Sequence, residues 1–271
     1  MEKDVADILL KIKAVTLNTV TPYKYANGFF SPIYVDCRII SSFPIERRII
    51  LNYFIEYIDE NVGRENIDVI VGSGHSGISL ATYLSERLKL PMAYVRFSAK
   101  EYGKKRIVEG IIQKNQKALL VSDIFETEGH VENSVEVLQN MGVEIVHVLS
   151  IFNSNLEIVD KFLKEKSISF YSLTNLKILL DAALVKKEIT TMERDEVLTW
   201  LLNPISWNDL QKEMTEKGIE KIKQDISKKM LEIKAVTLSP DEPYKYTSGI
   251  LSPIYCDNRL WMSYPKHWKI L

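Results

Sequence analysis

The chain contains 271 residues, of which 46% are hydrophobic and 26% are charged, as is usual for a globular protein with one large domain or one domain plus an appendage. Its 35 basic and 36 acidic residues give a formal net charge of −1, which argues against a general nucleic-acid or membrane-surface binder. Two cysteines are too few for a disulfide scaffold, and the N-terminal segment does not resemble a signal peptide. No apolar stretch is long enough to span a bilayer, so we expect a cytoplasmic protein that binds neither nucleic acid nor membranes.

The first elements in chain order are a helix, a β-rich segment and a second helix. The apolar spacing predicts the first helix over 3–14. Residues 20–38 contain short β-like runs between Pro and Gly residues, which is typical of hairpins in a small hood. Pro44 suits the first turn of a helix, and we expect that helix to continue over 45–62.

Apolar strands and amphipathic helices alternate along the next part of the chain. The expected strands are 67–72, 92–97, 117–123 and 143–152, with helices over 78–90 and 130–142. This alternation predicts an α/β fold whose parallel sheet is flanked by helices. Ligands bind such sheets at the carboxyl ends of the strands. Three loops therefore point to one site: 72–77, 96–110 and 123–130.

Two of these loops have compositions that suit an anion. The sequence GSGHSG at 72–77 offers small residues and backbone N–H groups at a helix start, although it matches neither the GxGxxG pattern nor the P-loop. The sequence RFSAKEYGKKRIVEG at 96–110 is strongly basic. Two interpretations of it remain open, namely a solvated surface loop and a loop that closes over a polyanion beside the other two turns.

An internal repeat relates the two ends of the chain. Residues 10–50 and 231–271 align without a gap, with roughly half of the positions identical, and share IKAVTL, PYKY and SPIY. The repeat unit is too long for a solenoid, so it indicates a duplicated domain whose second copy is cut short. We expect this second copy to pack against the first domain, to swap into a partner or to remain loose. Residues 209–230 have the apolar spacing of an amphipathic helix, which predicts a helical connector.

Several motifs in order resemble orotate phosphoribosyltransferases. They are GFFSPIYVDCR near the start, AYVR followed by a basic loop that ends in EG, and the strand LLVSD followed by a Thr-x-Gly turn. The resemblance extends over about 3–208 and divides the chain into a domain at 1–208, a connector at 209–230 and a truncated repeat at 231–271. It implies the type I phosphoribosyltransferase fold, which is an α/β fold with a parallel sheet, flanking helices and a small N-terminal hood.

The same resemblance implies an activity. Members of this family transfer ribose 5-phosphate from phosphoribosyl pyrophosphate to orotate, giving orotidine 5′-monophosphate and pyrophosphate in pyrimidine nucleotide biosynthesis. The implied cofactor is Mg2+, chelated through the diphosphate rather than by a set of protein ligands. The implied assembly is a homodimer in which the basic loop of one subunit reaches into the site of its neighbour.

The resemblance also assigns roles to individual positions. Asp123, Lys100 and Arg96 match the catalytic residues of the family, and Tyr34 and Glu126 match positions that contact orotate. The positions that match the phosphoribosyl pyrophosphate site are Arg96, Lys100, Tyr102, Lys104, Ser122, Asp123, Ile124, Phe125, Glu126, Thr127, Glu128, Gly129 and His130.

The chain departs from the family pattern at the turn after Asp123. Ser122 replaces an acid, Glu126 and His130 replace Ser or Thr, and Glu128 replaces Gly, while Tyr102 in the basic loop replaces His. Two like unit charges about 4 Å apart repel by ~1 kcal/mol in water and by ~4 kcal/mol at an effective dielectric of 20. Three hypotheses follow. They are a divergent orotate phosphoribosyltransferase, a non-catalytic relative that serves as dimer partner or nucleotide sensor, and a phosphoribosyltransferase for another base, whose amino group donates to Glu126.

Overall fold

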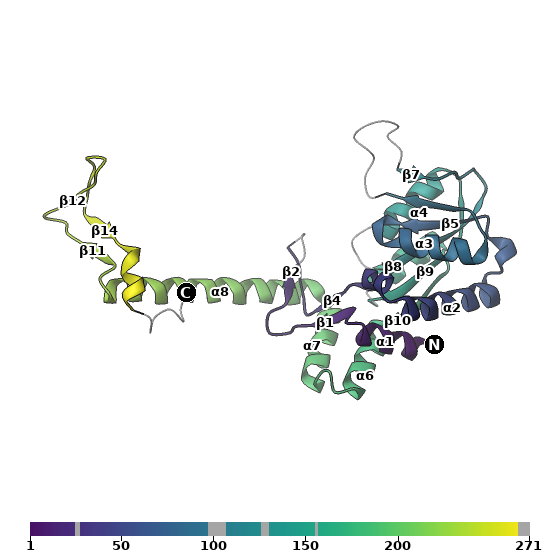
Figure 1. The fold of residues 1–271 in the computed structure, drawn as a ribbon, viewed down its shortest axis with the longest axis horizontal. Coiled ribbons are helices and arrows are strands. Elements are labelled where there is room, and N and C mark those ends of the chain that lie inside the picture. Colours follow the sequence, from purple (N-terminus) through teal and green to yellow (C-terminus); the bar gives the residue numbers. More distant parts are fainter. Residues whose placement is uncertain (25–27, 97–106, 126–129, 155–156, 265–271) are drawn as a thin grey trace. The chain divides into compact units, whose positions relative to one another are not determined.

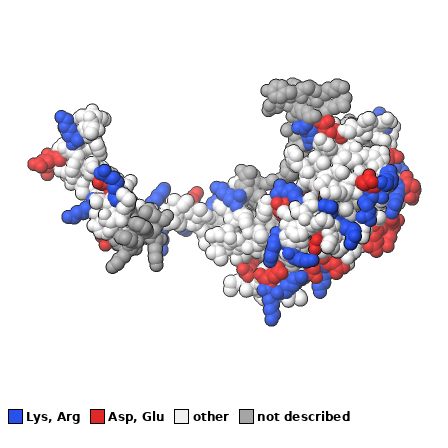
Figure 2. All heavy atoms as spheres, viewed as in Figure 1, with Lys and Arg blue, Asp and Glu red and all other residues white. Residues whose placement is uncertain are grey.

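The computed structural model describes the chain except residues 25–27, 97–106, 126–129, 155–156 and 265–271 (Figure 1). The chain forms two compact units, Met1–Pro204 and Ile205–Leu271. The boundary proposed from the sequence, at 208, lies four residues beyond this division. No helix within the described ranges combines the length and the apolar character that crossing a membrane requires. Figure 2 shows basic and acidic side chains interspersed on the visible face of the first unit.

A six-stranded sheet with the order β10-β9-β8-β5-β6-β7 forms the centre of the first unit. All neighbouring pairs are parallel except β6 and β7, which are antiparallel. The strands are β5 (Val69–Ser73), β6 (Met92–Val95), β7 (Val108–Glu109), β8 (Lys117–Phe125), β9 (Glu144–Asn153) and β10 (Phe170–Asn175). The predicted parallel sheet is therefore confirmed, and β7 adds an antiparallel edge that the sequence pattern did not indicate.

Helices cover both faces of this sheet (Figure 1). They are α1 (Glu2–Lys11), α2 (Pro44–Asn61), α3 (Gly74–Leu88), α4 (His130–Asn140), α5 (Glu157–Lys166), α6 (Leu176–Val185) and α7 (Thr191–Leu202), with a short 3-10 turn η2 (Arg64–Asn66). Successive side chains of β8 enter different cores: Leu119 and Val121 pack with α1, α2, α3 and α6, whereas Ala118 and Leu120 pack with α4. Because both faces are covered, β8 is apolar without interruption over residues 118–121.

The first helix is shorter than the sequence pattern predicts. It ends at Lys11 rather than near residue 14, because Lys13 adopts a left-handed conformation with φ of 60° that turns the chain into the first strand. The second helix begins at Pro44, as expected. At α7 the side chains of Thr190 and Glu193 form a reciprocal capping box, which fixes where that helix begins.

A hood precedes the sheet, and we define the first hood as residues 12–43. Strand β1 (Val15–Leu17) pairs antiparallel with β4 (Ile33–Val35), and β2 (Tyr23–Lys24) pairs with β3 (Phe30–Ser31). A 3-10 helix, η1 (Cys37–Ser42), follows and leads into α2. We call residues 44–202, which contain the sheet and α2–α7, the body. The hairpins that the Pro and Gly positions predict are confirmed.

The second unit contains a long helix and a second hood, defined as residues 233–264. Helix α8 (Pro204–Glu232) includes the whole predicted connector and is longer at both ends. It is followed by β11 (Val236–Leu238), β12 (Tyr244–Lys245), β13 (Leu251–Ser252), β14 (Ile254–Cys256) and η3 (Asn258–Ser263). The pairing of β11 with β14 has the register of β1 with β4, since Val236 faces Cys256 as Val15 faces Val35.

Two glycines allow α3 to lie directly against the sheet. A Cβ at Gly77 would lie 2.6 Å from the carbonyl oxygen of Val121 in β8, and one at Gly72 would lie 2.7 Å from the carbonyl oxygen of Gly77. Both contacts are with backbone, which cannot move aside cheaply. Gly72 and Gly77 therefore have a packing role, since they bring the first turn of α3 to the carboxyl ends of β5 and β8.

We predict that Gly77→Ala lowers the free energy of unfolding of the first unit by about 1–3 kcal/mol, because the added methyl group overpacks this contact. Chemical denaturation followed by circular dichroism measures the change. Gly218→Ala is the matched control, since no described atom lies within 4 Å of a Cβ there, and in a helix it should be neutral or stabilise by up to about 1 kcal/mol. Equal effects of the two variants would contradict the packing role.

Candidate active site

Asp123 is a buried carboxylate near the carboxyl end of the central strand β8. Its side chain is 7% exposed, and its Oδ1 accepts a hydrogen bond from the backbone N–H of Ile124 at 2.8 Å. Burial raises the pKa of Asp123, and a hydrogen bond from the side chain of Ser76 opposes that rise. Ser76 belongs to the first turn of α3, so the helix that Gly72 and Gly77 bring close also supports this carboxylate.

The neighbours of Asp123 in β8 have structural roles. Ser122 is buried, and its hydroxyl donates to the carbonyl oxygen of Ile124 at 2.9 Å. The Phe125 side chain is fully buried and meets Phe170 edge to face, with ring centroids 5.0 Å apart. The Phe125 side chain therefore faces the core, so only the backbone of Phe125 can contact a ligand at this site.

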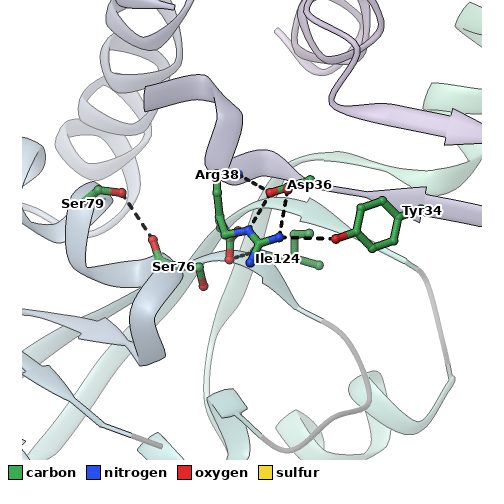
Figure 3. A network of polar contacts seen from close by, with 7 residues as sticks. Tyr34, Asp36, Arg38, Ser76, Ser79 and Ile124 are labelled. Atoms are coloured by element: carbon green, nitrogen blue, oxygen red, sulfur yellow. Dashed lines mark hydrogen bonds and ion pairs between the residues drawn. The ribbon is translucent and has the colours of Figure 1, made fainter. Parts of the chain in front are cut away.

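The first hood contributes a basic group to the same place. Arg38 donates from Nε and Nη2 to the two carboxylate oxygens of Asp36, at 2.7 and 2.8 Å, and Nη2 also donates to the hydroxyl of Tyr34 at 3.3 Å (Figure 3). Asp36 caps η1 as well, because it accepts from the backbone N–H of Arg38. The bidentate pair lowers the pKa of Asp36 and orients the guanidinium.

Arg38 and Asp123 interact electrostatically and line one small cavity between η1, α2 and the start of α3. The cavity has a volume of about 20 Å³, enough for about one water molecule and far too small for a nucleotide. Ser76 and Ser79 line it too, and Ser79 donates to the carbonyl oxygen of Ser76 at 3.5 Å (Figure 3). This cavity therefore lies where the first hood meets the sheet, and it is not a substrate pocket.

Sequence reasoning did not select Arg38 or Ser76 as site residues. The pattern that identifies Arg38 is its spacing from Asp36 in the SPIYVDCR segment, which recurs as Asp257 and Arg259 in the second hood. Ser76 lies within GSGHSG, but its contact with Asp123 depends on how closely α3 approaches β8.

Arg96 lies at the same edge of the sheet as Asp123. It directly follows β6, and β6 and β8 are both parallel neighbours of β5, so their carboxyl ends share one edge. Its Nη1 lies 3.4 Å from Oε1 of Glu109 in β7, and both side chains are partly exposed. This ion pair holds Arg96 beside the strand ends and, given its exposure, contributes little to stability.

Most of the remaining predicted site residues cannot be placed in the structure. Lys100, Tyr102, Lys104 and the turn Glu126, Thr127, Glu128 and Gly129 lie outside the described residues. His130 begins α4. The described part of the site thus brings together Asp123, Ser122 and Arg96, with Tyr34 supplied from the first hood.

A buried hydrogen bond links the end of β5, where α3 begins, to α4. The hydroxyl groups of Ser73, at the end of β5, and Ser134, in α4, lie 2.9 Å apart in a buried hydrogen bond. This bond ties the start of α3 to the first turns of α4, the helix that begins at His130. The N-termini of both helices therefore face the sheet edge that carries Asp123, where their dipoles favour an anion.

The donor set of the described residues fits a cation that is carried chiefly by its substrate. No cluster of three or more His, Cys, Asp or Glu able to hold a metal is found in the described part of the chain. Mg2+ characteristically keeps several waters and binds through one or two carboxylates plus substrate phosphates. Among the described residues, Asp123 near the end of β8 would be a carboxylate available to share in such a site.

Comparison with known proteins identifies the family, although no family model matched the chain. The chain is 39% identical over 207 residues to the orotate phosphoribosyltransferase of Listeria innocua, covering 76% of this chain and 98% of that protein. It is 35% identical over 204 residues to the orotate phosphoribosyltransferase of Coxiella burnetii, covering 75% and 97%.

Solved structures agree with the fold. Orotate phosphoribosyltransferase from Aeropyrum pernix aligns with a TM-score of 0.57 and 25% identity, over 65% of this chain and 96% of that one. The UMP synthase of Leishmania donovani aligns with a TM-score of 0.62 at 20% identity, over 73% and 42%, and supports the fold alone. The predicted type I phosphoribosyltransferase fold is confirmed, and the chain belongs to the orotate phosphoribosyltransferase family.

Proposed function

We propose that this chain transfers ribose 5-phosphate from phosphoribosyl pyrophosphate to N1 of orotate, forming orotidine 5′-monophosphate and releasing pyrophosphate. The observation that carries the proposal, together with the family, is Asp123: a buried, hydrogen-bonded carboxylate near the end of β8, opposite Arg38 of the first hood. A carboxylate kept in a costly buried position, with no bidentate cationic partner among the described residues, is typical of a functional site rather than of a stabilising ion pair.

The chemistry needs stabilisation of charge more than a strong base. The bond from the ribose C1 to the pyrophosphate oxygen breaks as the bond to orotate N1 forms, so positive charge develops on the sugar and negative charge on the leaving group. In the proposed complex Asp123 accepts hydrogen bonds from the ribose hydroxyls. The first turn of α3, which contains Ser76, and the residues before α4 bind the 5-phosphate.

The diphosphate end is assigned to the basic groups. Arg96, released from or shared with Glu109, contacts the leaving group together with Lys100, Tyr102 and Lys104 of the basic loop. When bound, Mg2+ neutralises part of the charge that develops on the pyrophosphate. We further propose a cytoplasmic homodimer whose basic loops cross between subunits, as the family resemblance implies.

A second function is favoured by the sequence of the 126–129 turn. Glu126 and Glu128 bring carboxylates toward an anionic ligand, and Ser122 uses its hydroxyl within β8 instead of supplying an acid. A protein with these changes binds its nucleotide ligand but turns over slowly, and so acts as a sensor or a dimer partner. A phosphoribosyltransferase for another base would instead use Glu126 as an acceptor for an amino group.

The deciding experiment is an orotate-dependent assay of the purified chain with phosphoribosyl pyrophosphate and Mg2+, combined with calorimetry of phosphoribosyl pyrophosphate binding. We expect turnover, and we expect Glu126→Ser with Glu128→Gly to raise kcat/KM by about tenfold or more, since each removed repulsion is worth about 1–4 kcal/mol. Binding without turnover would favour the sensor, and activity with adenine or another amino-bearing base would favour the third hypothesis. A purified chain that shows no turnover and does not bind phosphoribosyl pyrophosphate would contradict the proposal.

Asp123→Asn separates function from stability. Because burial raises the pKa of Asp123, the charged form is disfavoured in the folded state, and its cost appears as pH rises through that pKa. We expect Asp123→Asn to keep or raise the Tm at pH 7, whereas kcat/KM falls about 10- to 100-fold as a charged hydrogen bond to ribose is lost. A lowered Tm with unchanged kcat/KM would show that Asp123 is structural.

The two hoods provide a matched pair of arginines. Arg259 donates to the carboxylate oxygens of Asp257 at 2.7 and 2.9 Å, nearly as Arg38 does to Asp36, but the charge of Asp123 acts on Arg38. We expect Arg38→Ala to lower kcat/KM for orotate about tenfold, because Tyr34 and Asp123 both lose the guanidinium. Arg259→Ala should leave kcat/KM unchanged. Steady-state kinetics of both variants check this, and equal losses would exclude a site role for Arg38.

A further inference from the structure

The short strand β7 places a carboxylate beside Arg96. Glu109 in β7 lies opposite Tyr94 in β6, two residues before Arg96, and the backbone N–H of Arg96 donates to the carbonyl oxygen of Ile107 at 2.8 Å. In this register Arg96 and Glu109 are diagonal neighbours on one face of the strand pair, within reach of long side chains. The two oppositely charged residues therefore meet at the edge of the sheet, where the basic segment of the sequence begins and ends.

Gly110 fixes where this carboxylate lies. Its φ is 97°, and a Cβ there would lie 2.9 Å from the Cβ of Ala93 and 3.0 Å from the carbonyl oxygen of Met92. A residue with a side chain would therefore push the end of β7 away from β6. The Glu-Gly pair that ends the basic segment is thus held closely against the sheet, and this keeps Glu109 in contact with Arg96.

The ion pair of Arg96 is loose compared with that of the other arginine of the site. Nη1 of Arg96 lies 3.4 Å from Oε1 of Glu109, which is the one polar partner of this guanidinium among the described residues. Arg38, by contrast, donates to both carboxylate oxygens of Asp36, at 2.7 and 2.8 Å. The side chains of Arg96 and Glu109 are 30% and 24% exposed. Because one long contact in a partly exposed pair contributes little to stability, an anion can replace Glu109 at low cost.

We propose that Glu109 competes with the diphosphate of phosphoribosyl pyrophosphate for Arg96, and that it thereby lowers the affinity of the site for pyrophosphate. The inference rests on the proposed function, in which Arg96 contacts the leaving group. A diphosphate at Nη1 of Arg96 either takes the place of the carboxylate or lies beside it as a like charge, and both arrangements cost affinity. Pyrophosphate then leaves more readily, because Arg96 returns to a partner that β7 holds in place.

The sign of one effect separates competition from a purely structural role. If Glu109 served to orient Arg96 for the diphosphate, removal of the carboxylate charge would weaken diphosphate binding. If Glu109 competes, removal of that charge strengthens the binding. Glu109→Gln has nearly the same shape and keeps an amide oxygen that can accept from Nη1 of Arg96, so this variant removes the charge and leaves the arginine oriented.

The test is calorimetry of the full-length chain with pyrophosphate and Mg2+ at fixed ionic strength, together with steady-state kinetics. We expect Glu109→Gln to bind pyrophosphate about fivefold more tightly, which corresponds to ~1 kcal/mol, and to lower KM for phosphoribosyl pyrophosphate by a similar factor. The value of kcat should stay unchanged or fall, because release of pyrophosphate slows. KM for orotate should not change, nor should the affinity for ribose 5-phosphate, which lacks the diphosphate.

Glu86→Gln is the matched control, because it also removes one carboxylate charge from the first unit. Glu86 pairs with Lys89 at the far end of α3, away from the strand ends that carry Arg96 and Asp123. This variant should leave the affinity for pyrophosphate and both KM values unchanged. A gain in Glu86→Gln as large as that in Glu109→Gln would show an effect of net charge and would contradict local competition.

Pyrophosphate binding that is weakened or unchanged in Glu109→Gln would overturn the inference and leave the proposed function intact. A wild-type chain that binds neither pyrophosphate nor phosphoribosyl pyrophosphate would contradict the proposed function and this inference with it. Circular dichroism checks that each variant folds. If Glu109→Gln does not fold, Glu109→Ala takes its place with the same expected gain, and the absence of that gain counts against competition in the same way.

Discussion

The close approach of α3 to the sheet is the contact on which the site depends. Gly72 and Gly77 leave no room for a Cβ between β5, α3 and β8, so the first turn of α3 lies directly at the strand ends. Ser76 in that turn then reaches Asp123, and Ser73 before it reaches Ser134 of α4. Two helix starts and a carboxylate are thereby held at one edge of the sheet, because rigid backbone contacts leave them no other arrangement.

The charged side chains at this edge of the sheet have separate partners. Arg38 is tied to Asp36 by a bidentate pair within the hood, and it acts on Asp123 through space rather than by a second ion pair. Asp123 therefore keeps a carboxylate with capacity to accept hydrogen bonds. Arg96 is likewise held beside the strand ends by Glu109. Under the proposed function, a ribose hydroxyl meets Asp123 without first breaking an ion pair to any described residue.

The first hood shows how burial depends on a neighbouring surface. Ile33 is buried because it belongs to the large core that the hood shares with α1, α2, α6 and the sheet. Local structure does not need that body, since the hairpins, the 3-10 helix and the Arg–Asp pair form in both copies. Contacts within the hood therefore determine its local shape, whereas the burial of Ile33 and Val35 in the first unit depends on the large core that they share with the body.

The sequence by itself determined the family, the alternation of strands and helices over 67–152 and the repeat, because each rests on local periodicity or on motifs that are contiguous in the chain. It also selected Asp123, whose role in the site stays a prediction. It did not indicate the antiparallel edge strand β7, the end of α1 at Lys11, the burial of Phe125, or the roles of Arg38 and Ser76. Those depend on which segments far apart in the chain lie together. Only the tertiary structure, through the contact of α3 with β8 and of the hood with the body, places Arg38 and Ser76 beside Asp123.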